Sequence, residues 1–208
     1  MATKLLQRFI IYSASTPLIL LSRIAEVFNL WGIEKDLSDC LSTVDGFGNE
    51  IPHLFITVLV TAEDRRNALH FGVDPIAVIR AAYMSAKGYR QGASTIEQQF
   101  VRVVTKRYEK NIKRKLKEQI LAVTVARHRS KDQIAAAYLS IAFYGSGILG
   151  VKGLKAKCGQ LLSGANTADV IGMVARLKYP EPLVPSKSWA QKFTKRIQYI
   201  AARLECHR

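Results

Sequence analysis

Apolar residues recur at helical spacing along most of the chain, and stretches that alternate between apolar and polar residues are nearly absent. An apolar run at residues 51–60 is followed by four consecutive charges, Glu63, Asp64, Arg65 and Arg66. Pro52 is expected to open a helix through this run, and Asp74 followed by Pro75 is a second helix start, with an aspartate N-cap. This pattern predicts a mainly α fold of long helices joined by short loops.

The N-terminal residues 1–31 hold two apolar segments, at 9–22 and 24–31. Taking Thr16 as an N-cap and Pro17 as the first helical residue gives an amphipathic helix in this region. Three interpretations stay open: a signal anchor, a helix in the membrane interface, and a core helix. We predict that this segment associates with a membrane, and the sequence leaves open whether it spans the bilayer or lies on it.

Three further stretches are predicted to lack helix. Residues 32–50 are polar, and the Asp-Gly-Phe-Gly-Asn segment at 45–49 has the composition of a turn-rich loop. A mobile loop is expected at residues 87–92, where glycines and cations have little to bury. Residues 145–150 match the dinucleotide-binding fingerprint, but a helix is predicted before them where that fingerprint needs a strand. We therefore predict a turn between two helices there.

Charge narrows the choice of partner. The chain of 208 residues has 31 Lys+Arg against 16 Asp+Glu, a net charge of +15, which implies an anionic partner such as nucleic acid, anionic lipid or a phosphorylated substrate. The run at residues 106–117 is especially basic, with Glu109 its one acid. A hydrophobic content of 49% argues against disorder and for one domain with a sizeable core. The three cysteines lack the spacing of a disulfide framework or a zinc site.

Three motifs combine acids, amides and cations. They are Glu-Asp-Arg-Arg-Asn-x-x-His-x-Gly-x-Asp at 63–74, Gly-x-Ser-Thr-Ile-Glu-Gln-Gln-x-x-Arg at 92–102, and Arg-Lys-x-x-Glu at 114–118. In order and spacing they resemble the signature motifs of glycosyltransferase family 51. These are the peptidoglycan glycosyltransferases, found alone or at the front of bifunctional penicillin-binding proteins. Weaker matches at 134–144 and 195–200 extend the resemblance over roughly residues 50–205.

The resemblance implies a lysozyme-like helical fold with a cleft and a membrane-associated hydrophobic lobe, formed by residues 32–208. It implies an enzyme that polymerises lipid II into glycan strands with inversion, as an acceptor hydroxyl displaces the lipid pyrophosphate. The implied partners are lipid II, the nascent glycan strand, the membrane surface and other cell-wall synthesis proteins, without nucleic acid. The implied location is the outer face of the cytoplasmic membrane.

The same resemblance assigns roles to residues. Glu63 matches the family's general base, and Glu118 matches its second catalytic glutamate, near the pyrophosphate. An ionised Glu118 would repel that group, so a cation must lie between them; Arg102, Arg114, Lys117 or a divalent ion such as Mg²⁺ would serve. A divalent ion is the only cofactor implied. The predicted substrate-binding residues are Asp64, Arg65, Arg66, Ser94, Thr95, Gln98, Gln99, Arg102, Arg114, Lys115, Lys117, Lys195 and Arg196.

Several positions depart from the family's pattern. Asn67 replaces phenylalanine, Glu97 threonine, Arg102 lysine and Ala136 glutamate. Glu97 places a new negative charge in the second motif. Without a Ser-x-x-Lys motif, the chain is predicted to be a short, monofunctional and divergent member.

Three alternatives remain open. The first is a catalytically silent protein of the same fold that binds membrane or lipid II. The second is a lysozyme-like enzyme that cleaves finished glycan with Glu63 as the acid. The third is a nucleic-acid binder that uses residues 106–117.

Overall fold

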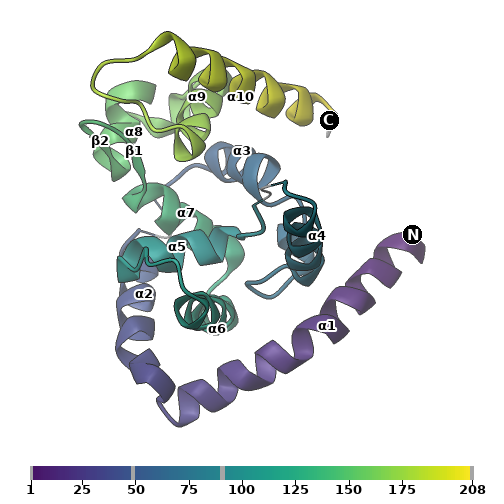
Figure 1. Ribbon diagram of the computed structural model, residues 1–208. Helices are drawn as coiled ribbons and strands as arrows, with labels where there is room; N and C mark the ends of the chain where they lie inside the picture. Colours follow the sequence, from purple (N-terminus) through teal and green to yellow (C-terminus); the bar gives the residue numbers. More distant parts are fainter. Residues whose placement is uncertain (1, 48–49, 90–91, 207–208) are drawn as a thin grey trace. The chain divides into compact units, whose positions relative to one another are not determined.

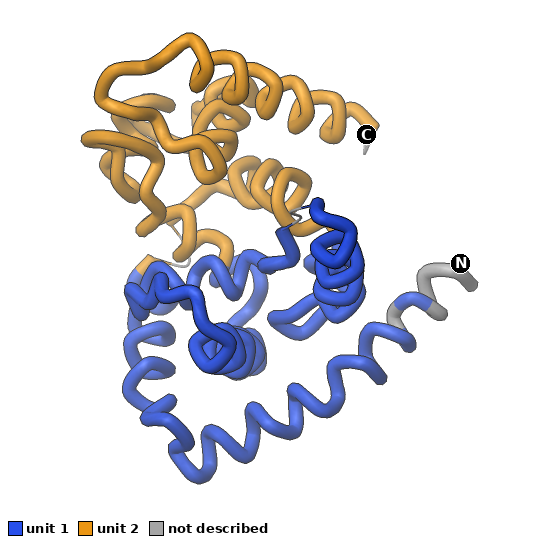
Figure 2. The backbone as a smooth tube through the Cα atoms, in the orientation of Figure 1, with its two compact units in different colours: residues 1–46, 66–134 blue, residues 47–65, 135–208 orange. Residues whose placement is uncertain are grey.

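The structure is a computed structural model that describes residues 2–47, 50–89 and 92–206, and these residues are mostly helical (Figure 1). The predicted mainly α fold is confirmed. The chain divides into two compact units, residues 1–46 with 66–134 (unit 1) and residues 47–65 with 135–208 (unit 2), coloured separately in Figure 2. The helices of the described residues are α1 Ala2–Val27, α2 Ile33–Phe47, α3 His53–Glu63, α4 Pro75–Ala86, α5 Ile96–Thr105, α6 Ile112–His128, α7 Lys131–Ile141, α8 Gly150–Cys158, α9 Thr167–Lys178 and α10 Lys187–Glu205.

Unit 1 is built around α6, whose residues 120–125 are all buried. Ile120, Leu121, Ala122, Val123 and Val125 are all at most 1% exposed. Helices α1 and α5 pack against α6, and α1 also contacts α4. Since a helix that is apolar all round belongs in a protein core, α6 is the element that fixes the other helices of this unit. Its basic first turns project from this core and carry Glu118.

Helix α1 is one continuous helix, so the predicted start at Thr16 is wrong. The Thr16 hydroxyl donates to the Tyr12 carbonyl one turn earlier instead of capping a helix, and Pro17 lies inside the helix. Among the described side chains of α1, the buried residues are Ile11, Ser15, Ser22 and Ala25, so its buried face is partly polar. Its outward face carries exposed large apolar side chains, Phe9, Ile10, Leu20, Ile24 and Val27. Residues 9–27 are long and apolar enough to cross a membrane, by length and composition.

No helix was predicted within the polar residues 32–50, and the loop predicted at 45–49 is wrong at residues 45–47, which are helical. Helix α2 covers Ile33–Phe47, and Ile33, Leu37, Cys40 and Val44 form its buried stripe at helical spacing. Four apolar residues among many polar ones were too sparse to stand out in the sequence. The loop predictions at 45–49 and 87–92 fall partly on residues 48–49 and 90–91, which lie outside the described residues.

Gly72 lies in the first motif and fixes how the chain crosses α6. Its φ of +80° is in the left-handed region, and a Cβ at this position would lie 2.5 Å from the Ala122 carbonyl oxygen. The Gly72 carbonyl accepts a 2.6 Å hydrogen bond from the Thr95 hydroxyl, which joins the first motif to the second. Only glycine fits here, because both the conformation and the space exclude a side chain.

Gly72→Ala should therefore lower the free energy of unfolding by about 3 kcal/mol, the sum of left-handed strain and a backbone clash. Gly88→Ala is the matched control, because Gly88 has the same φ of +80° and a Cβ there would have no atom within 4 Å. The control should lose about 1 kcal/mol from strain alone. Urea unfolding in mild detergent, followed by circular dichroism, measures both; equal losses would contradict the clash with α6.

Unit 2 contains a three-helix group in which α3, α9 and α10 contact one another. The glycine-rich segment predicted as a helix–helix turn instead forms a small antiparallel hairpin, β1 Phe143–Gly145 with β2 Ile148–Leu149. Gly145 has a φ of +149° and packs on the backbone of Glu181, where a Cβ would lie 2.4 Å from the Glu181 carbonyl oxygen. This close approach explains the glycine. The three-residue strand β1 belongs to a two-stranded antiparallel sheet with β2, whereas a dinucleotide site needs the parallel strands of a βαβ unit.

Candidate active site

Glu63 is the last residue of α3 in unit 2, where the apolar helix ends. From α10, the Arg196 guanidinium donates to Glu63 Oε1 at 2.5 Å and to the Ala62 carbonyl at 3.0 Å. The Glu63 side chain is 17% exposed and the Arg196 side chain 9%, so the pair is largely removed from water. Arg196 thus orients the Glu63 carboxylate at the helix end. Its neighbour Lys195, the other predicted residue of this motif, is exposed.

Glu118 is surrounded by three cations in unit 1. Arg102 from α5 forks onto it, with 2.9 Å from Nε to Oε2 and 3.1 Å from Nη2 to Oε1. Arg114 donates to Oε2 at 2.5 Å and Lys115 to Oε1 at 2.6 Å. The Glu118 side chain is only 3% exposed. The structure therefore brings the predicted residues Arg102, Arg114 and Lys115 together on one carboxylate, which we call the Glu118 cluster.

Positive charge dominates in the Glu118 cluster. Burial alone would raise the pKa of Glu118, but hydrogen bonds from Arg102 and Lys115 outweigh it and hold the pKa below its ordinary value of 4.5. Burial lowers the pKa of Lys115, against the hydrogen bond to Glu118, which raises it. One carboxylate among three cations leaves a surplus of two positive charges when all are ionised. Such a group is suited to binding an anion with more than one charge.

Two polar residues of the second motif join the cluster. The Ser94 hydroxyl lies 3.2 Å from both Arg102 Nη2 and Lys115 Nζ, and Gln98 Oε1 lies 3.3 Å from Lys115 Nζ. The capping box of α5 consists of Thr95 and Gln98. With Thr95 as the cap, the Ser94 hydroxyl is left to face the cations.

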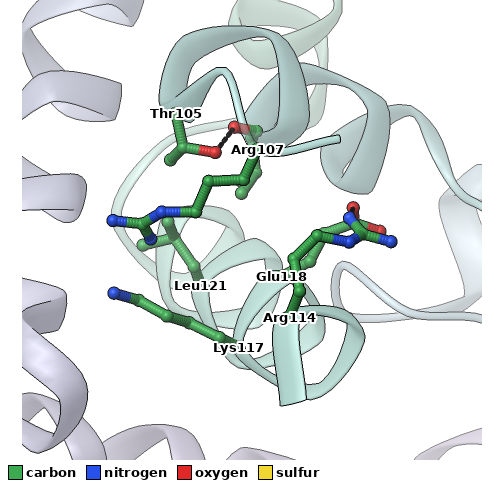
Figure 3. Close-up of a pocket in the computed structure, with 7 residues that line it drawn as sticks. Thr105, Arg107, Arg114, Lys117, Glu118 and Leu121 are labelled. Atoms are coloured by element: carbon green, nitrogen blue, oxygen red, sulfur yellow. Dashed lines mark hydrogen bonds and ion pairs between the residues drawn. The ribbon is translucent and has the colours of Figure 1, made fainter. Parts of the chain in front are cut away.

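Lys117 belongs to a second, separate charge group. It donates to Asp36 at 2.8 Å, and Arg107 contacts both Asp36 oxygens at 2.5 and 3.1 Å. Figure 3 shows Arg107 and Lys117 pointing to one side of a small pocket, and Arg114 with Glu118 on the other. Lys117 is therefore paired with Asp36 and is not one of the cations at Glu118, a role that the resemblance left open. Asp36 was missed because no helix was predicted at α2.

Comparison with known proteins agrees with these motifs. A model of the transglycosylase family matches residues 45–205. The chain belongs to this family. Its relatives include penicillin-binding protein 1A of Rickettsia felis, 32% identical over 162 residues, which are 75% of this chain and 20% of the relative. Penicillin-binding protein 1A of Aquifex aeolicus is 39% identical over 106 residues, 50% of this chain and 15% of the relative. The chain spans a fifth or less of the length of these curated relatives.

Two departures from the transglycosylase motifs contact each other in unit 1. The Asn67 amide nitrogen lies 3.5 Å from Glu97 Oε1, and the same oxygen accepts a hydrogen bond from Lys131. The Glu97 side chain is 1% exposed, so its charge is buried against Lys131. Lys131 Nζ also lies 3.3 Å from His70 Nδ1. The negative charge that Glu97 adds to the second motif is thus paired locally.

The remaining predicted residues have varied surroundings. Arg66 forms an ion pair with Asp74, the N-cap of α4, at 2.7 Å and so supports the helix start that the sequence predicted. Asp64 is buried directly after α3, and Arg65 beside it is exposed. Gln99 is half-buried on α5.

A divalent cation does not fit at Glu118, although the transglycosylase resemblance allowed one there. Both carboxylate oxygens already accept hydrogen bonds from cations, two on Oε1 and two on Oε2. Mg²⁺ needs accessible oxygen ligands, and the three positive side chains around this carboxylate would repel it. Arg102, Arg114 and Lys115 occupy the place that the ion would take.

Proposed function

We propose that this chain is a peptidoglycan glycosyltransferase that polymerises lipid II into glycan strands with inversion at the anomeric carbon. The Glu118 cluster carries the proposal, because a surplus of positive charge held on rigid helices suits a pyrophosphate leaving group. Its residues are those of the second and third transglycosylase motifs.

Glu63 is proposed as the general base. It takes the proton from the acceptor hydroxyl while that oxygen forms a bond to the anomeric carbon of the donor. The bond from this carbon to the pyrophosphate oxygen breaks at the same centre, so no covalent enzyme intermediate is needed. Arg196 holds one carboxylate oxygen of Glu63 and thereby sets the direction from which the proton is accepted.

Arg102, Arg114 and Lys115 are proposed to neutralise the charge that grows on the leaving pyrophosphate. They are pre-organised by Glu118, so little reorganisation is needed when the bond breaks. Glu118 is therefore proposed to arrange cations rather than to exchange a proton. This role agrees with its lowered pKa, which keeps it ionised at neutral pH.

The lipid tail of the proposed substrate lies in a bilayer, so the enzyme must work at a membrane. The surface of α1 supports such a location. Three of the four described buried residues of α1, Ser15, Ser22 and Ala25, are small and the fourth is Ile11, while Phe9, Leu20 and Val27 are exposed. Helices in lipid typically place small residues where they contact other helices and large apolar residues toward the lipid. We propose that residues 1–31 associate with the cytoplasmic membrane, with the remainder of the chain on its outer face.

Arg196→Lys tests the positioning of Glu63. Lysine keeps the charge but loses the planar guanidinium, whose Nη2 donates to both Glu63 and the Ala62 carbonyl, so kcat should fall about 10-fold. KM should change less than 2-fold, roughly, because Arg196 acts through Glu63. Lys192→Gln, an exposed change on the same helix, is the control. A rise in KM with unchanged kcat would instead make Arg196 a substrate contact.

Two substrates separate the proposal from its alternatives. Purified chain in detergent is given labelled lipid II in one reaction and finished cell-wall glycan in the other. The proposal predicts long strands from lipid II and no fragments from finished glycan. Fragments from glycan would establish a lysozyme-like enzyme, and binding of lipid II without product would establish a silent binding protein.

A further inference from the structure

The basic run at residues 106–117 separates into paired and unpaired cations. Arg107 and Lys117 are paired with Asp36, and Arg114 and Lys115 are paired with Glu118. The other three lysines, Lys106, Lys110 and Lys113, are exposed and form no ion pair with the described residues. These three cations serve neither buried carboxylate, so the Glu118 cluster does not explain them.

Large apolar side chains alternate with these lysines. Tyr108 is 62% exposed, Ile112 88% and Leu116 37%. The backbone lifts this stretch away from α5: Lys106 ends that helix in a left-handed conformation with a φ of 54°, and α6 starts only after the N-cap Asn111. We call residues 106–116, which comprise the connection after α5 and the start of α6, the basic loop. Exposed aliphatic and aromatic side chains among unpaired lysines are typical of a surface that enters a lipid headgroup region.

We propose that the basic loop docks on the anionic surface of a lipid bilayer. Tyr108 and Ile112 enter the headgroup region, and the three lysines contact lipid phosphates. Complementary charge favours this partner, since each lysine near an anionic membrane adds to its attraction. The inference goes beyond the proposed reaction, because it concerns which lipids hold the protein and not which bond forms.

The neighbouring surface supports a bilayer over a nucleic acid. Lys117 on α6 donates to the Trp31 carbonyl at 2.7 Å, which ties the corner after α1 to the helix that the basic loop enters. Phe28 and Trp31 at this corner are 71% and 55% exposed. Unit 1 therefore presents exposed apolar side chains both on the basic loop and just after the end of α1. Isolated aliphatic side chains such as Ile112 have no counterpart on a phosphate backbone, whereas a bilayer accepts them.

A fluorescent label on the basic loop tests the docking directly and does not depend on how α1 is held. An environment-sensitive label is attached to Glu109→Cys in a Cys206→Ser background, where the remaining Cys40 and Cys158 are buried. The labelled full chain is mixed with vesicles of phosphatidylcholine, with or without phosphatidylglycerol. The fluorescence should rise several-fold with anionic vesicles and little with neutral ones. The same label at Lys192→Cys should not respond to either.

Two variants identify the contacts. The triple change Lys106→Gln, Lys110→Gln and Lys113→Gln should weaken the response to anionic vesicles about 100-fold in lipid concentration. A matched triple change at exposed lysines of unit 2, Lys152→Gln, Lys155→Gln and Lys192→Gln, should leave it within about 3-fold. Ile112→Ser should reduce the response at equal charge.

The outcomes that would overturn the proposal are distinct from a failure of the enzyme. An equal response to neutral and anionic vesicles, no response to either, or equal losses in the two triple variants would each contradict it. A stronger response to duplex DNA than to vesicles would assign the basic loop to nucleic acid. The assay of lipid II polymerisation in detergent contains no anionic bilayer, so it tests the proposed reaction separately from membrane docking.

Discussion

Glu63→Gln should reduce the rate of lipid II polymerisation by about 10²–10⁴-fold, the range expected when a general base is removed. Glutamine keeps the size of the side chain and can still accept the hydrogen bond from Arg196, but it cannot take the proton of the acceptor hydroxyl. Lipid II binding should be nearly unchanged, because its pyrophosphate is assigned to the cations of unit 1. The measurement is the initial rate of strand formation, with binding followed separately.

The control for Glu63→Gln is a measurement of its thermal stability. Its thermal transition in detergent should lie close to that of the parent, since Arg196 also donates to the Ala62 carbonyl. Activity within about 3-fold of the parent would remove Glu63 as the base, because even a weak general base contributes more than that. A large loss of both stability and binding would instead make the Glu63–Arg196 pair structural.

Glu118→Gln should lower the free energy of unfolding by about 3 kcal/mol. Removing one partner of a buried ionic group costs about 3–5 kcal/mol, and the lower end applies because Arg102 and Lys115 are partly exposed and can turn toward water. The three cations would then repel one another without their shared carboxylate. Urea unfolding of the parent and the variant measures the difference. Glu109→Gln, an exposed change on the same basic stretch, should stay within about 0.5 kcal/mol.

The pH dependence of stability in the parent and in Glu118→Gln tests whether Glu118 acts through its charge. The pKa of Glu118 in the folded chain is below its ordinary value of 4.5, so its stabilising contribution is fully present above that value. The contribution is lost as the pH falls through the lowered folded-state pKa. The stability difference between parent and Glu118→Gln should therefore be constant at neutral pH and shrink in acid below about pH 4.5. A difference that does not change in acid would show that Glu118 does not act through its charge.

The sequence predicted the helices with strong start signals and missed those without them. Pro52 lies directly before α3, and Asp74 caps α4 with Pro75 as its first residue; the sequence displays both start signals directly. Helix α2 has a sparse apolar stripe that becomes meaningful only when it is buried. The continuity of α1 through Pro17 likewise depends on packing against α6.

For the candidate site, the motifs located the chemistry but not the pairing of charges. Spacing on α6 places Arg114 and Lys115 near Glu118, one turn away, and this is readable in the sequence. The choice of Arg102 for Glu118, of Lys117 for Asp36 and of Arg196 for Glu63 depends on which helices pack together. No local pattern encodes such long-range pairing, so the cations that were predicted as one set of substrate contacts separate into groups with different partners.

The most direct test of lipid II polymerisation by this chain is to incubate the purified protein in detergent with labelled lipid II and to follow the products over time. We predict long glycan strands whose new linkages are inverted at the anomeric carbon, with one lipid pyrophosphate released for each linkage formed. Lipid II that remains unchanged, or strands with retained configuration, would contradict the proposed reaction.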